Sequence, residues 1–109
     1  MRATWQNAGS ATGLVRCRLH IPALDLDLNP RISSGRPLAA VRRFIASHLP
    51  TASSALIGAS FSIRAEIRAK GGGARWRVLS RWQFGESVDD ALDRATSEWR
   101  QLPKEHKAR

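Results

Sequence analysis

The sequence predicts an α+β fold, a two-layer sandwich in which two helices cover one face of an antiparallel sheet of three to four strands. Two kinds of pattern lead to this prediction. Several segments alternate between apolar and polar residues, as half-buried strands do, and two others repeat apolar residues at helical spacing. The 109 residues suit a single domain. The expected order of elements is β(β)αββα.

The first strand is expected at residues 14–21, LVRCRLHI. Alternate positions separate its apolar side chains, Val15, Cys17, Leu19 and Ile21, from its polar ones, Arg16, Arg18 and His20. Pro22 interrupts the pattern, and residues 24–28 resume it in the opposite phase. A change of phase at a proline is typical of a bulge, or of a turn into a short second strand. The next stretch, RISSGRP, is expected to be a loop.

The first helix is expected at residues 37–50, PLAAVRRFIASHLP. Its apolar residues recur three and four positions apart. Pro37 suits a first turn, Ser34 is a possible N-cap, and Pro50 forbids continuation. His48 falls on the apolar side, where we interpret it as a packed core residue rather than a metal ligand.

Two long strands, residues 55–70 and 74–84, flank three glycines and predict a β-hairpin. In the first strand the residues Phe61, Ile63, Ala65, Ile67 and Ala69 face one way. In the second strand the same role falls to Trp76, Val78, Ser80, Trp82 and Phe84. Charged residues fill most of the positions between them, so one face of the hairpin is apolar and the other is basic.

Parity restricts the register of this hairpin, because residues opposite each other must lie on the same face. A two-residue Gly71-Gly72 turn would pair Glu66 with Arg77 and Phe61 with Trp82. A four-residue loop, 71–74, would instead set several cations directly opposite one another, which is destabilising. A loop of the three glycines alone would mix the two faces unless a bulge intervened. We favour the two-residue turn.

Both the two-residue and the four-residue loop give the hairpin a cationic face that holds Glu66 as its one acid. Together with the polar face of the first strand, it would form one continuous basic surface on the sheet. The candidate nucleic-acid-binding residues are Arg16, Arg18, Arg64, Arg68, Lys70, Arg75, Arg77 and Arg81. The face as predicted carries no aromatic side chain, which disfavours recognition by base stacking and favours contacts to the phosphate backbone.

The last helix has the clearest boundaries. Ser87 is the expected N-cap, followed by acidic residues in the first turn, and Pro103 marks the end. Trp99 belongs to the apolar stripe of this helix and is expected to pack over the sheet. The domain prediction is therefore a flexible segment at 1–13, a single α+β domain at 14–103 and a disordered basic tail at 104–109.

The net charge of +9 is the unusual feature of the composition. Such a charge favours polyanionic partners, of which nucleic acid is the most common. Fifteen of the 18 cations are arginine, however, and the chain is rich in alanine, so a compositional bias of the genome explains part of the charge. No segment is apolar and long enough to cross a bilayer or to serve as a secretory signal, and we expect a cytoplasmic protein with no membrane contact.

No catalytic signature is present, and we expect neither enzymatic activity nor a cofactor or metal. Asp25, Asp27 and Asn29 match the start of a calcium-binding loop, but Pro30 and Arg36 occupy the positions that need glycine and glutamate. The two aspartates are better interpreted as the polar face of a short strand. Cys17 lies in an apolar pattern and is interpreted as a buried small side chain.

The function predicted from these patterns is non-catalytic binding of nucleic acid, DNA or RNA, through the basic sheet face. The alternative is a protein–protein interaction module, such as a phage- or plasmid-type accessory or inhibitor protein that docks on an acidic partner. A third interpretation, in which the cations only solvate an exposed face of the sheet, needs no ligand.

The end of the chain, a hairpin followed by FGESVDDALDRATSEW, resembles two families. One is the double-stranded-RNA-binding domain, whose β-hairpins precede a C-terminal helix. This chain has Ser87, Asp89 and Asp90 where that domain carries lysines, and it opens with a strand. The other family is the small antitoxins of toxin–antitoxin pairs, which often end in a similar strand and capped helix. Neither resemblance covers enough of the chain to assign a family.

Overall fold

A computed structural model describes residues 9–104 of the chain. Its elements, in order, are β1 (Ser10–Ile21), η2 (Pro22–Leu24), β2 (Leu26–Leu28), β3 (Arg31–Ser33), α1 (Pro37–His48), η3 (Ser53–Leu56), β4 (Ser60–Arg68), β5 (Ala74–Gln83) and α2 (Val88–Gln101). Most of the segment expected to be flexible, and of the tail expected to be disordered, lies outside the described residues. Lys104 is described and lies beside Ala11 of β1.

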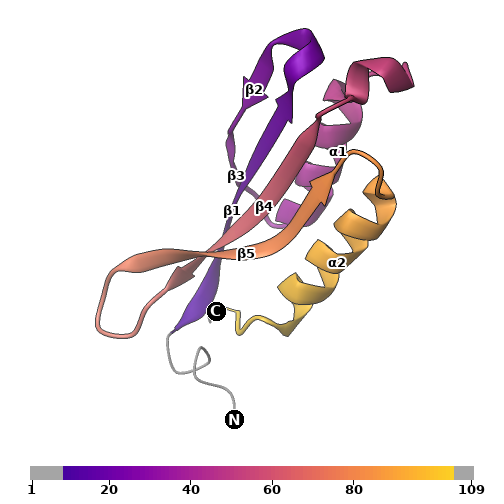
Figure 1. The fold of residues 1–109 in the computed structure, drawn as a ribbon. Helices are drawn as coiled ribbons and strands as arrows, with labels where there is room; N and C mark the ends of the chain where they lie inside the picture. Colours follow the sequence, from indigo (N-terminus) through magenta and orange to yellow (C-terminus); the bar gives the residue numbers. More distant parts are fainter. Residues whose placement is uncertain (1–8, 105–109) are drawn as a thin grey trace.

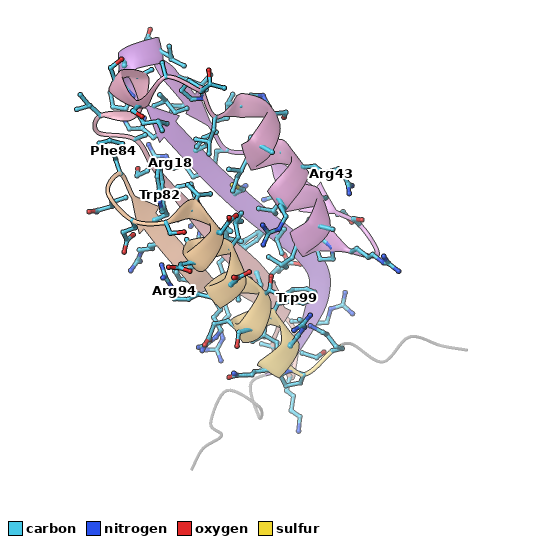
Figure 2. All side chains as sticks on the ribbon, turned by 90° about the vertical axis from the view of Figure 1, so that its right-hand side faces the viewer. Arg18, Arg43, Trp82, Phe84, Arg94 and Trp99 are labelled. Atoms are coloured by element: carbon cyan, nitrogen blue, oxygen red, sulfur yellow. The ribbon has the colours of Figure 1, made fainter. Side chains whose placement is uncertain are left out.

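The described residues form the predicted α+β two-layer sandwich. Five strands make an antiparallel sheet in the order β2-β1-β4-β5, and β3 also pairs with β1. Figure 1 shows β1 and β4 running side by side at the centre of the sheet, and Figure 2 shows α1 and α2 lying together over one face. We call the opposite face, which the helices leave uncovered, the outer face.

The fifth strand, β3, was not predicted, because the stretch RISSGRP has the serine, glycine and proline content typical of a loop. Its three residues pair with the first half of β1, so that Leu14 lies opposite Ser33 and Arg16 lies opposite Arg31. The strand β1 begins at Ser10, four residues before the expected start, but the residues that pair with β3 lie within the predicted strand. Three residues are too few to show a periodic pattern, and only the long neighbouring strand reveals them as part of the sheet.

The expected turn at Pro22 is present. Residues 22–24 form a single 3₁₀ turn, and Asp25 then adopts a left-handed backbone conformation, with φ of 51°. The chain reverses, and Leu26 lies opposite Ile21. The change of phase in the sequence therefore marks a turn between β1 and β2.

The start and end of α1 differ in part from the prediction. The helix begins at Pro37 as expected, but the N-cap residue is Arg36, which makes no side-chain capping bond. Ser34 accepts a hydrogen bond from the Arg36 amide and so closes a local turn instead. His48 is exposed rather than buried, because its ring folds back to the Phe44 carbonyl, 2.9 Å away, at the solvent side of the last turn.

Helix α2 agrees with its prediction. The Ser87 hydroxyl accepts a hydrogen bond from the amide of Asp90, which satisfies one of the free donors of the first turn. Arg42 of α1 contacts Asp89 and Asp93 of α2 at 3.4 Å each, so one side chain links the two helices. Arg94 donates to the carbonyl of Arg81 and holds α2 against the free edge of β5.

The β4–β5 hairpin follows neither of the two predicted registers over its whole length. Near the body of the sheet Phe61 lies opposite Trp82, as predicted, but beyond Ile63 the register shifts and Arg64 lies opposite Val78. Leu79 is the extra residue, and it forms a bulge in β5. At the tip, Lys70, Gly71 and Gly72 form a three-residue loop closed by a bond from the Ala69 amide to the Gly73 carbonyl. Gly71, Gly72 and Gly73 all have positive φ, which side chains disfavour.

The bulge reverses which residues of β5 reach the outer face. Beyond it, Trp76 lies opposite Glu66 and Val78 lies opposite Arg64, so both are on the outer face. Arg75 and Arg77 then point to the helix side. The sequence-based assignment of Trp76 to the core, and of these two arginines to the basic face, is therefore wrong. One extra residue in a strand moves every later side chain to the other face.

The core lies between the sheet and the helices. Its largest fully buried side chain is Trp82, which is 2% exposed. The Trp82 ring stacks on Phe61 with ring centroids 5.1 Å apart, and its indole nitrogen donates to the Glu86 carbonyl. The aromatic pair therefore anchors the proximal half of the hairpin to the core.

Replacement of Trp82 by alanine should lower the free energy of unfolding by about 3–5 kcal/mol, because it opens a large cavity in the core. Urea unfolding followed by circular dichroism measures this loss. Phe84→Ala is the matched control: Phe84 lies two residues further along and is 43% exposed. Its truncation should cost about 1 kcal/mol or less. Equal losses in the two variants would contradict this description of the core.

Candidate nucleic-acid interface

The outer face of the sheet is strongly basic. The strand registers place six arginines on it: Arg16, Arg18, Arg31, Arg64, Arg68 and Arg81. Within the described residues its strands carry two carboxylates, Asp27 and Glu66. The helix layer differs, because α2 and the turn before it hold Glu86, Asp89, Asp90, Asp93 and Glu98, five of the nine acids of the chain. The fold therefore separates charge that is mixed along the sequence.

Three arginines form a row across adjacent strands. Arg16 of β1 lies directly opposite Arg31 of β3 on one side and directly opposite Arg64 of β4 on the other. We call these three residues the arginine row. Neighbouring strands are about 4.8 Å apart, and like charges at that separation destabilise a sheet. None of the three forms an ion pair with a carboxylate among residues 9–104.

Trp76 packs against the arginine row. The guanidinium carbons of Arg16 and Arg31 lie 5.3 Å and 6.0 Å from the centre of its ring. The negative face of an indole ring attracts such cations and offsets part of their mutual repulsion. The Nε atom of Arg16 is buried and has no hydrogen-bond partner in the described part of the chain. Contact with the ring therefore holds these guanidinium groups in place without neutralising them.

Arg18 and Asp27 form an ion pair on the outer face. Arg18 donates two hydrogen bonds to the Asp27 carboxylate, at 3.1 Å and 2.8 Å. The hydrogen bonds that Arg18 donates to the carboxylate lower the pKa of Asp27 and raise the pKa of Arg18. A lowered carboxyl pKa keeps the pair charged at neutral pH. The contribution of this ion pair to stability is lost only as the pH falls through the lowered pKa of Asp27.

A shallow hollow of about 240 Å³ lies beside this ion pair. Its polar lining comes from three strands and includes Arg18, His20, Ser60, Ser62 and Arg81. The His20 ring lies 3.8 Å from the Asp27 carboxylate at its Nδ1 atom. Hydroxyl and guanidinium donors therefore converge at the end of the outer face away from the hairpin tip.

The remaining predicted site residues cluster around the tip of the hairpin. Arg68 is exposed on the outer face, Lys70 is exposed in the turn, and Arg75 is exposed on the helix side. Arg77 also points to the helix side, where it donates to the Glu98 carboxylate at 3.1 Å. The eight predicted cations therefore do not share one face. Five lie on the outer face, one is in the loop and two point to the helices.

Sequence reasoning missed three residues of the outer face, Arg31, Trp76 and Val78. Arg31 falls in the stretch that was predicted to be a loop, and a three-residue strand leaves no periodic signal. Trp76 lies between two arginines, at an even-numbered position like the buried Trp82. In a strand without a bulge, Trp76 would therefore point to the same side as Trp82. A bulge in the hairpin, which a three-residue loop would require, was the one feature of the sequence analysis that allowed Trp76 to lie on the outer face.

The other candidate residues do not assemble into a reactive site. Within residues 9–104 no group of three His, Cys, Asp or Glu side chains is placed to bind a metal ion. Asp25 lies in the turn before β2, and Asp27 is held by Arg18. No helix within residues 9–104 has the length and apolar character needed to cross a membrane. Comparisons with protein-family models, curated proteins and solved structures find no match to this chain.

Cys17 is buried in the core below the arginine row, on the opposite side of β1. Burial raises the pKa of its thiol to about 12, because the charged thiolate would lose its hydration. Since the thiolate is the reactive form, the folded protein should resist alkylation at pH 8, and the unfolded protein should react readily. Mass spectrometry after brief treatment with iodoacetamide, with and without denaturant, measures the difference. Equal labelling would contradict the buried position.

Proposed function

We propose that this protein binds nucleic acid, without catalysis, through the outer face of its sheet. The observation that supports the proposal best is the arginine row. Arg31, Arg16 and Arg64 lie directly opposite one another on three adjacent strands and have no carboxylate partner among the described residues. This arrangement costs stability in the free protein, and a bound polyanion would recover that cost.

The chemistry of the row suits phosphate. A guanidinium group donates two parallel hydrogen bonds to a phosphate, and contact with the Trp76 ring reduces the freedom that Arg16 and Arg31 would lose on binding. A phosphate backbone that runs across β3, β1 and β4 would meet one guanidinium on each strand. Binding would release counterions and would therefore weaken steeply as salt rises.

The function can be tested by reversing two charges of the row, Arg16→Glu and Arg64→Glu together. Fluorescence anisotropy with a labelled oligonucleotide of mixed sequence at 50 mM salt measures affinity. We expect a loss of at least tenfold, with a shallower dependence of affinity on salt, because two phosphate contacts are removed. Thermal unfolding confirms that the variant remains folded.

The matched control reverses two arginines of the helix layer, Arg43→Glu and Arg100→Glu, which changes the net charge equally. Arg43 lies on α1, on the far side of the molecule from the outer face (Figure 2). This control should lose much less affinity. If it loses as much as the double variant of the row, net charge alone is responsible. If the unmodified protein does not bind at low salt, the proposed function is wrong.

Removing the acid that neutralises Arg18 should strengthen binding. Asp27→Asn keeps the size of the side chain but releases Arg18 from its ion pair. We expect affinity to rise roughly two- to fivefold, the range that corresponds to a surface ion pair. Asp93→Asn, which affects Arg42 on the helix layer, is the matched control and should change affinity less. An unchanged affinity in Asp27→Asn would show that Arg18 lies outside the interface.

A protein partner with an acidic surface is the alternative that the same face allows. Size-exclusion chromatography of the protein, purified with and without nuclease treatment, separates the two functions. Nucleic acid that co-purifies and is lost after nuclease treatment supports the proposal. Binding to poly-glutamate that equals binding to an oligonucleotide of the same charge favours an acidic protein.

A further inference from the structure

We propose that the ligand is single-stranded nucleic acid, and that an unpaired base stacks at Trp76. This inference rests on the proposed function and narrows it to one class of ligand. The β-bulge at Leu79 is its origin, because it turns an aromatic side chain from the core side of β5 to the outer face, next to the arginine row.

Trp76 and Val78 form a small apolar area inside a cationic surface. Both lie on the outer face beyond the bulge. Val78 is 36% exposed, and Trp76 is only partly buried. A large apolar side chain that remains accessible between arginines has no role in the core of this fold. It suits a ligand that is flat and apolar on its faces and carries negative charge beside them, as a nucleotide does.

A hollow next to Trp76 provides room for a base. It has a volume of about 500 Å³ and is lined by Ile67, Arg75, Trp76, Arg77 and Val78. Trp76 and Val78 belong to the outer face, whereas Ile67, Arg75 and Arg77 point to the helix side. The hollow therefore lies around the free edge of β5, where the two faces meet, and both apolar groups and guanidinium groups line it. Arg75 is exposed at its rim, where it can contact a phosphate next to a docked base.

Stacking at Trp76 requires a base that is free of its partner. In a duplex both faces of each base are covered by its neighbours, so a protein surface reaches only base edges and phosphates. In a single strand the base faces are accessible, and stacking on aromatic side chains supplies affinity with little dependence on sequence. The arginine row would hold the backbone of such a strand, and Trp76 would receive a base from it.

The test compares a single-stranded oligonucleotide with its own duplex, by anisotropy at 50 mM salt, for the unmodified protein and Trp76→Leu. Leucine keeps an apolar side chain but cannot stack. We expect the single strand to bind more tightly than the duplex, and Trp76→Leu to weaken single-strand binding about 5- to 100-fold. Duplex binding should change much less. Trp99→Leu removes a second tryptophan that also contacts a cation, Lys104, but lies on α2, and serves as the matched control.

A second readout keeps the test valid if Trp76→Leu is unstable. Trp76→Phe retains an aromatic ring and should keep most of the affinity for the single strand. Stacking of a base on an indole quenches its fluorescence, so the quenching seen with the unmodified protein should largely disappear in Trp76→Phe. Quenching that persists in this variant would place the stacked base elsewhere and overturn the inference.

The outcomes separate this inference from the proposed function. If single strand and duplex bind equally, or if Trp76→Leu weakens both in the same proportion, Trp76 serves only to position Arg16 and Arg31, and stacking is wrong. Binding through the arginine row would stand in that case. If neither oligonucleotide binds at low salt, or if poly-glutamate binds as tightly as the single strand, the proposed function fails and the inference fails with it.

Discussion

The single extra residue in β5 is the constraint on which the rest of the outer face depends. Side chains of a strand alternate between two faces, so the bulge at Leu79 reverses the exposure of every residue between it and the hairpin tip. Trp76 reaches the outer face for this reason alone, and Arg77 turns to meet Glu98 of α2. Without the bulge, Arg75 and Arg77 would join the outer face and Trp76 would point to the helix side.

The electrostatics of the outer face are a property of the assembled sheet. Arg16, Arg31 and Arg64 come from three different strands and are far apart in the sequence. The pairing of β1 with β3 and with β4 brings them directly opposite one another. The helix layer gathers most of the acids, where Arg42 and Arg77 use them to join elements together. These carboxylates lie in the helix layer, so they do not neutralise the arginine row on the outer face of the sheet.

Much of the fold could be predicted from local patterns. The alternation in β1, β4 and β5 and the capped start of α2 at Ser87 identified these elements, because each pattern extends over many residues. Exposed His48 and the missing side-chain cap of α1 could not be predicted, since each depends on how a few atoms at a helix end find local partners. The short strand β3 can be identified only from its pairing with β1.

The sequence by itself determined that the sheet has one apolar and one basic side, because a period of two residues separates the side chains of each strand whatever its neighbours are. It also determined Arg16, Arg18, Arg64, Arg68 and Arg81 as residues of the basic side. Only the tertiary structure decided that Arg31 completes a row with Arg16 and Arg64, and that Trp76 joins them. Contacts between strands set the register and the bulges. The parity of the side chains restricted the register of the hairpin but could not locate the bulge.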